Sequence, residues 1–86
     1  MIPQPLWWLS FISGRTFKGA CVVEAVDVER ALSRAKSLGI YPGGRTLGSK
    51  IPPDCRGGFF CFKDQLFTRT EAERIYKANS SPVILN

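Results

Sequence analysis

Two apolar segments near the start of the chain predict a β-hairpin. Residues 6–12 and 17–26, LWWLSFI and FKGACVVEAV, are rich in aromatic and β-branched residues, and a short loop with one glycine, SGRT at 13–16, separates them. Alternation gives the first strand two faces, with Trp7, Leu9 and Phe11 on one and Leu6, Trp8, Ser10 and Ile12 on the other. Since both faces are apolar, we expect a helix to cover one and another subunit to cover the other.

Residues 27–39, DVERALSRAKSLG, carry the clearest helical pattern. Asp27 is a suitable N-cap, and Gly39 can adopt the left-handed conformation that ends a helix. A single apolar stripe follows the helical spacing and consists of Val28, Ala31, Leu32, Ala35 and Leu38. We therefore expect this helix to pack on the sheet along that stripe.

The middle of the chain is predicted to be a loop, because residues 40–58 hold three of the six prolines and five of the eight glycines. After it, GFFCF at 58–62 predicts a strand, followed by a turn and a short return strand through 66–67. TRTEAERIYKAN at 68–79 predicts a second helix, in which Thr68 with Glu71, or Thr70 with Glu73, fits a capping box.

These elements predict a single α+β domain over residues 1–86, in the order β-β-α-loop-β-(β)-α. We expect a small antiparallel sheet of three or four strands that carries two helices on one face. The apolar surplus on the opposite face would then favour a homo-oligomer. The tail, SSPVILN at 80–86, could add an edge strand or dock on a neighbour.

Composition narrows the classes of partner. Twelve Lys and Arg against seven Asp and Glu give a formal net charge of +5, which favours an anionic partner such as a nucleotide, a nucleic acid or an acidic protein. Cys21, Cys55 and Cys61 are odd in number, with no histidine or Cys-x-x-Cys pair to complete a zinc site. We expect reduced structural thiols, no metal and no cofactor.

The apolar run at 6–12 is too short to span a bilayer, and the residues before it lack the Lys or Arg of an export signal. We therefore expect a cytoplasmic protein with no membrane partner.

Residues 41–50, YPGGRTLGSK, contain the strongest candidate for a binding site. The spacing of Gly43 and Gly48 matches a Walker A loop, but Ser49 and Lys50 stand in reverse order, a helix precedes the segment and prolines follow it. What remains is either a solvated loop or a glycine turn whose donors hold an anion. The candidate ligand-binding residues are Tyr41, Gly43, Gly44, Arg45, Thr46, Ser49 and Lys50, together with Arg30, Arg34 and Trp8.

Catalysis finds little support, because the chain has no histidine and its carboxylates fit capping and turn roles. We expect no catalytic residue and a protein that is not an enzyme. Three binding functions remain open: a small phosphorylated ligand, a host protein or assembly partner held by an apolar sheet face or the tail, and nucleic acid as an accessory protein.

Four segments resemble a group of small hypothetical proteins of bacteria and their phages: WWLSF, FKGACVVEA, ALSRAKSLGIYPGG and IPPD, within residues 7–54. The shared features are a Trp-rich first strand, a VVEA-like second strand and a helix end of the form LG-x-x-PGG. The group has no established function, so no site residue is carried over. The resemblance implies a phage or prophage setting, in which small proteins often act in the host cytoplasm by sequestering a nucleotide signal of host defence or by blocking a host protein.

Overall fold

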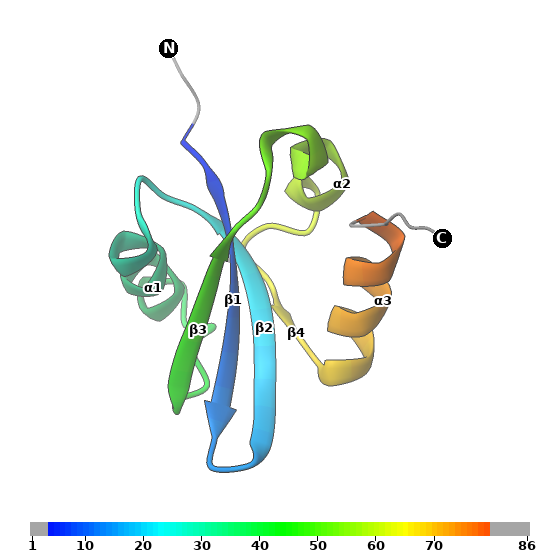
Figure 1. The fold of residues 1–86 in the computed structure, drawn as a ribbon. Helices are drawn as coiled ribbons and strands as arrows, with labels where there is room; N and C mark the ends of the chain where they lie inside the picture. The colour runs from blue at the N-terminus through cyan, green and yellow to red at the C-terminus, as the bar shows by residue number, and fades with distance from the viewer. Residues whose placement is uncertain (1–3, 80–86) are drawn as a thin grey trace.

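The computed structural model describes residues 4–79, which form an α+β fold with a four-stranded sheet (Figure 1). The strand order is β3-β1-β2-β4, and each neighbouring pair is antiparallel. The predicted fold class is therefore confirmed, whereas the predicted count of two helices is wrong. The elements are β1 (Leu6–Ser13), β2 (Thr16–Glu24), α1 (Val28–Ser37), β3 (Arg45–Lys50), a 3₁₀ turn (Pro53–Cys55), α2 (Arg56–Phe60), β4 (Leu66–Phe67) and α3 (Arg69–Asn79).

The predicted hairpin is confirmed, with β1 and β2 paired from Leu6 opposite Glu24 to Ser13 opposite Thr16. Gly14 turns the chain with a φ of 63°, a conformation that glycine adopts without strain. The register shifts between Phe11 and Ile12, so β2 contains one extra residue near the turn. Such a bulge bends the strand and increases its twist.

The first predicted helix is also confirmed. The Asp27 side chain accepts a hydrogen bond of 2.8 Å from the backbone N–H of Arg30, as an N-cap does. At the other end Gly39 has a φ of 74°, and the N–H of Ile40 donates to the carbonyl of Ala35. Ala31 and Ala35 are fully buried against the sheet, so small side chains bring α1 close to it.

The expected loop at 40–58 is wrong for residues 45–50, which form β3. Gly43 and Gly44 both have positive φ values, and they return the chain to the sheet after α1. A Cβ on Gly44 would lie 2.6 Å from the carbonyl oxygen of Ile12, so only glycine allows this approach. From Arg45 onward, every residue of β3 pairs with one on β1. The glycines and prolines of this segment favoured a loop, although a strand starts immediately after the glycine turn.

The expected strand at 58–62 is wrong as well. The chain forms a 3₁₀ turn that begins at Pro53 and continues into the short helix α2. Phe59 is buried and 2% exposed, while the adjacent Phe60 is 45% exposed. Consecutive aromatic residues fit a strand pattern, but here one of them anchors a helix. Cys61, the fourth residue of that expected strand, is the exposed C-cap residue of α2.

The two last predicted elements are confirmed. The short strand at 66–67 is present as β4, but it pairs antiparallel with β2 through Ala20 and Phe67, not with the strand expected at 58–62. At the start of α3, the Thr68 N–H donates to the Glu71 carboxylate at 3.0 Å, and the Glu71 N–H donates to the Thr68 hydroxyl at 3.3 Å. This reciprocal pair is the first of the two capping boxes that the sequence allowed.

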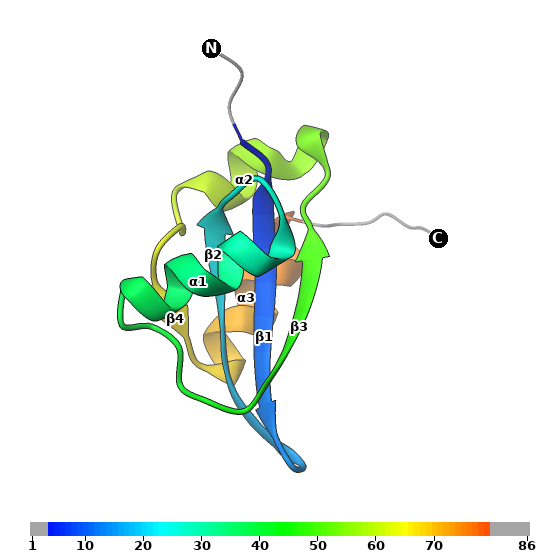
Figure 2. The same cartoon turned by 90° about the vertical axis from the view of Figure 1, so that its left-hand side faces the viewer.

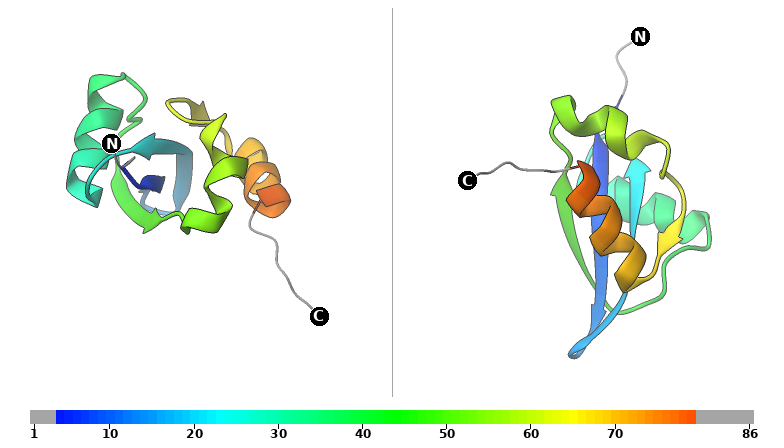
Figure 3. Two further views of the ribbon diagram at one scale, coloured as in Figure 1. Left: turned by 90° about the horizontal axis from the view of Figure 1, so that it is seen from above. Right: turned by 90° about the vertical axis from the view of Figure 1, so that its right-hand side faces the viewer.

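Helices cover both faces of the sheet, so the expectation of helices on one face is wrong. α1 lies on one face, and α2 and α3 lie on the other (Figures 1 and 3). One core, under α1, contains Leu9, Phe11, Cys21, Val23, Ala25, Ala31 and Ala35. The other core, under α2 and α3, contains Leu6, Ala20, Val22, Ile51, Phe59, Phe67, Ala72 and Ile75.

This three-layer packing removes the bare apolar sheet face on which the expected homo-oligomer and the expected protein contact depended. The tail at 80–86, the other expected contact surface, lies outside the described residues.

Candidate functional site

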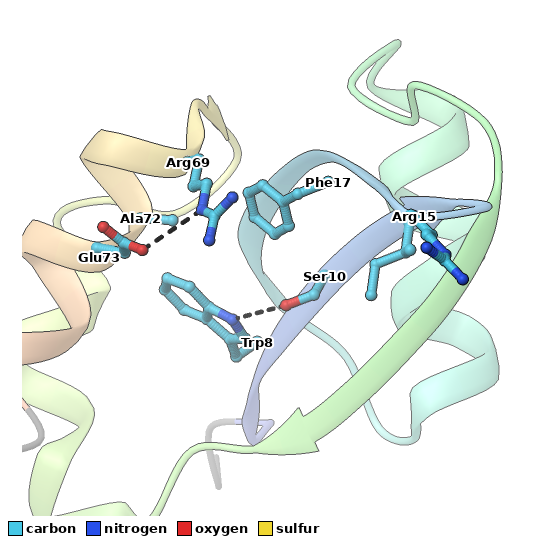
Figure 4. Close-up of a pocket in the computed structure, with 8 residues that line it drawn as sticks. Trp8, Ser10, Arg15, Phe17, Arg69, Ala72 and Glu73 are labelled. Carbon is cyan, nitrogen blue, oxygen red and sulfur yellow. Dashed lines mark hydrogen bonds and ion pairs between the residues drawn. The ribbon is translucent and has the colours of Figure 1, made fainter.

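A groove of about 630 Å³ lies between the β1–β2 hairpin and helix α3 (Figure 4). This volume is in the range that accommodates a small ligand. The groove exists because the hairpin extends beyond the part of the sheet that α3 covers, as Figure 1 shows. Its lining residues are Trp8, Ser10, Ile12, Arg15, Phe17, Arg69, Ala72 and Glu73.

The aromatic wall of the groove is held in place by contacts with the core under α2 and α3. The Trp8 ring stacks at 6.2 Å from Phe67 and meets Phe59 edge-on at 5.8 Å. Its indole N–H donates to the Ser10 hydroxyl at 3.1 Å, so the ring orientation is also fixed by a hydrogen bond. The Ser10 hydroxyl uses a lone pair in this bond and keeps its own proton to donate. Phe17 of β2 is half-buried and adds a second ring (Figure 4).

The charged wall comes from α3 and from the hairpin turn. The Arg69 Nε lies 3.5 Å from the Glu73 carboxylate, and both side chains are largely exposed. An exposed ion pair at this distance is weak, so the Arg69 guanidinium can leave Glu73 and bind an anionic ligand instead. Arg15 lies at the hairpin end of the groove, beyond Ser10 (Figure 4). Two arginines against one glutamate give the groove a net positive charge.

Of the predicted binding residues, Trp8 lines this groove, and two others share its face of the sheet. Side chains that lie directly opposite on neighbouring strands point to the same side. Arg45 is opposite Ile12 and Ser49 is opposite Trp8, so both face the α3 side.

Strand alternation separates the remaining β3 candidates from these two. Thr46 and Lys50 are opposite Phe11 and Trp7, which pack on the α1 side. The donors of YPGGRTLGSK are therefore divided between two faces and form no single cradle.

The other predicted residues have local structural contacts. The Tyr41 ring meets Phe11 edge-on at 5.4 Å, and its hydroxyl donates to the carbonyl of Gly44 at 2.7 Å. Arg30 forms an ion pair of 2.7 Å with its own N-cap, Asp27. Tyr41 and the two glycines after Pro42 thus shape the entry into β3.

Arg34 points toward a different edge of the molecule, where it lies 3.6 Å from the carboxylate of Asp64. It therefore belongs to a surface ion pair beside α1 and not to the groove.

Sequence reasoning did not select Ser10, Phe17, Arg69 or Glu73. The alternation along β1 already placed Ser10 beside Trp8 on one face, which was the available signal. Phe17 could be added only with the hairpin register, since it is opposite Ile12. Arg69 and Glu73 required knowing that α3 packs on this face, which no local pattern in the sequence shows.

Titration and metal binding add little to this site. Burial, and next the nearby Asp64 charge, raise the pKa of Cys21 to about 12, but this thiol lies in the core under α1. Between residues 4 and 79 there is no group of three or more His, Cys, Asp or Glu side chains that could hold a metal ion. In the same part of the chain, no helix has the length and apolar character needed to cross a membrane.

Comparison with known proteins gives no further assignment: no family model, no curated protein and no solved structure matches the chain.

Proposed function

We propose that this protein is a non-enzymatic binding protein for a small phosphorylated ligand that carries a planar ring, such as a nucleotide. The observation that carries the proposal is the groove in which the preorganised Trp8 ring and Phe17 face the Arg69 guanidinium. Aromatic rings bind a base by stacking, and a guanidinium binds phosphate oxygens through paired hydrogen bonds.

The polar groups of the groove fit the rest of such a ligand. Ser10 can donate its hydroxyl proton, and the Glu73 carboxylate can accept a hydrogen bond from a sugar hydroxyl or a base amine. Arg15 at the hairpin end supplies a second cation for a ligand with two phosphates. Sequestration of a nucleotide signal, which the phage resemblance implies, requires only binding of this kind. It needs no catalytic group.

The test is calorimetry with 5′-mononucleotides, cyclic dinucleotides and inorganic phosphate. We expect Arg69→Met to weaken nucleotide binding at least about tenfold, because the phosphate loses its main partner. Arg74→Met is the matched control, since Arg74 is an exposed arginine of α3 that lines a different groove. Failure of every nucleotide to bind, or equal losses in the two variants, would refute the proposal.

Two further variants separate the ring contact from the charge. Phe17→Leu should weaken nucleotides but leave inorganic phosphate unchanged, because only the stacking contact is lost. Glu73→Gln should strengthen binding of doubly charged phosphates, because it removes the carboxylate that competes for Arg69. A third variant, Arg45→Ala, tests whether the ligand binds in this groove or at the 41–50 segment. We expect a small effect on nucleotide affinity, whereas complete loss of binding would place the site at residues 41–50.

A further inference from the structure

Strand β3 forms an open edge of the sheet, independent of the ligand groove. It is last in the order β3-β1-β2-β4, and no described element pairs with its outer side. Figures 2 and 3 show it at the outer margin of the sheet, with α1 on one face and α3 on the other. Five of its six residues are exposed. An edge of this length can accept an additional strand.

The backbone groups available at this edge follow from the pairing with β1. The N–H of Ile51, directly after β3, donates to the carbonyl of Leu6 at 2.9 Å. Successive residues of a strand direct their N–H and C=O groups to opposite sides. Thr46, Gly48 and Lys50 therefore direct theirs away from β1, toward the open edge.

The charge of the edge selects among possible strands. Arg45 and Lys50 stand at its two ends. The chain as a whole is also basic, with a formal net charge of +5. Leu47, near the middle, is 48% exposed. A second copy of the chain would bring two more cations to the same short edge, and like charges close together oppose pairing. An acidic strand with an apolar residue near its centre complements all three positions.

We propose that β3 docks an extended acidic segment of another protein, which adds antiparallel to the sheet as a fifth strand. Antiparallel addition matches every strand pair already present. In this register one carboxylate lies opposite Lys50, a second lies opposite Arg45 five residues later, and an apolar side chain lies opposite Leu47. Backbone hydrogen bonds to the edge provide the affinity, and the spaced charges provide the specificity.

The probe is a capped, fluorescently labelled peptide, Glu-Thr-Thr-Val-Thr-Glu, titrated with the full chain and followed by anisotropy. We expect saturable binding at protein concentrations below about 1 mM, weakening as salt screens the charges. The same peptide with Lys in place of both Glu should bind at least about tenfold more weakly. The charge reversal Arg45→Glu with Lys50→Glu should invert this preference.

Backbone pairing is tested without altering the protein. In the proposed register the third peptide residue lies opposite Gly48 and directs its N–H toward β3, while the fourth directs its N–H to solvent. N-methylation of the third residue should therefore abolish binding, and N-methylation of the fourth should leave it within about threefold.

The matched control for the protein variant is Lys18→Glu with Arg74→Glu, which makes the same charge change at exposed positions outside β3. It should retain the preference for the acidic peptide. No binding of the acidic peptide, equal binding of both peptides, equal effects of the two methylations, or self-association of the free protein through β3 would each overturn the proposal.

Discussion

Cys21 illustrates how burial determines the chemistry of one residue. Its side chain is fully buried under α1, and burial raises the pKa of the thiol to about 12, with a smaller contribution from the nearby Asp64 charge. Ionisation of this thiol is therefore suppressed in the folded protein but not in the unfolded chain. Below about pH 9 the thiol is protonated in both states, so it does not make the free energy of unfolding depend on pH.

Above that pH the unfolded chain releases the thiol proton first, so the raised pKa lowers stability as the pH rises. We expect the wild type to lose up to about 1.4 kcal/mol per pH unit more than Cys21→Ala between pH 9 and 11. Urea unfolding at several pH values, with reductant present, measures this difference. Cys61→Ala, at an exposed position, should show the wild-type slope. Parallel slopes for wild type and Cys21→Ala would contradict the expectation.

At the scale of elements, the residue patterns correctly predicted those helices and strands that are determined by local interactions. The hairpin, α1 and α3 were predictable because a turn glycine, an N-cap or a capping box acts within a few residues, as Asp27 and the Thr68–Glu71 pair do. β3 and α2 were not, since their states depend on distant partners. β3 exists through its pairing with β1, and α2 is held by Arg56, which lies 2.6 Å from the Glu24 carboxylate of β2.

The candidate site was predictable only in part for the same reason. Trp8 could be selected from its own strand, but Arg69 reaches the groove only through the packing of α3 on the opposite side of the sheet from α1. Sequence proximity grouped Arg45 with Lys50, whereas the pleat of β3 sends them to opposite faces.

The contact between α1 and β3 depends on Gly48. A Cβ at this position would overlap the Val28 Cγ2 atom and lie 3.3 Å from the Leu9 Cδ2 atom. Gly48→Ala should therefore push α1 from the sheet and lower the free energy of unfolding by about 1–3 kcal/mol. Thermal or urea unfolding measures the loss. Val28→Ala in the same chain should recover part of it, because the overlapping methyl group is then absent.

Gly57 provides the control for that substitution. It lies in α2, where a Cβ would meet nothing within 4 Å. Gly57→Ala should be neutral or stabilise the protein by roughly 0.5–1 kcal/mol, as alanine does in place of glycine within a helix. A loss at Gly57 equal to that at Gly48 would show that the glycine at β3 has no special packing role.

Residues 4–79 form two small cores that share the same central strands. Along β2, Ala20 and Val22 belong to the core under α2 and α3, while Cys21 and Val23 belong to the core under α1. Neither core can persist if β1 and β2 separate, because each would lose one wall entirely. The two halves are therefore coupled through the hairpin strands that they share, and we expect them to unfold in one transition.

The two tryptophans allow a direct test, since they lie on opposite sides of β1. Trp7 packs against the core under α1 and donates its indole N–H to the carbonyl of Ala25 at 2.9 Å, whereas Trp8 packs against Phe59 and Phe67 in the other core. Trp7→Phe leaves a fluorescence reporter in one core, and Trp8→Phe leaves one in the other. Within each variant, the fluorescence midpoint in urea should coincide with the midpoint of the far-ultraviolet circular dichroism. If the fluorescence transition preceded the loss of secondary structure in either variant, the core that contains the remaining tryptophan would unfold independently of the other core, which would contradict the expectation.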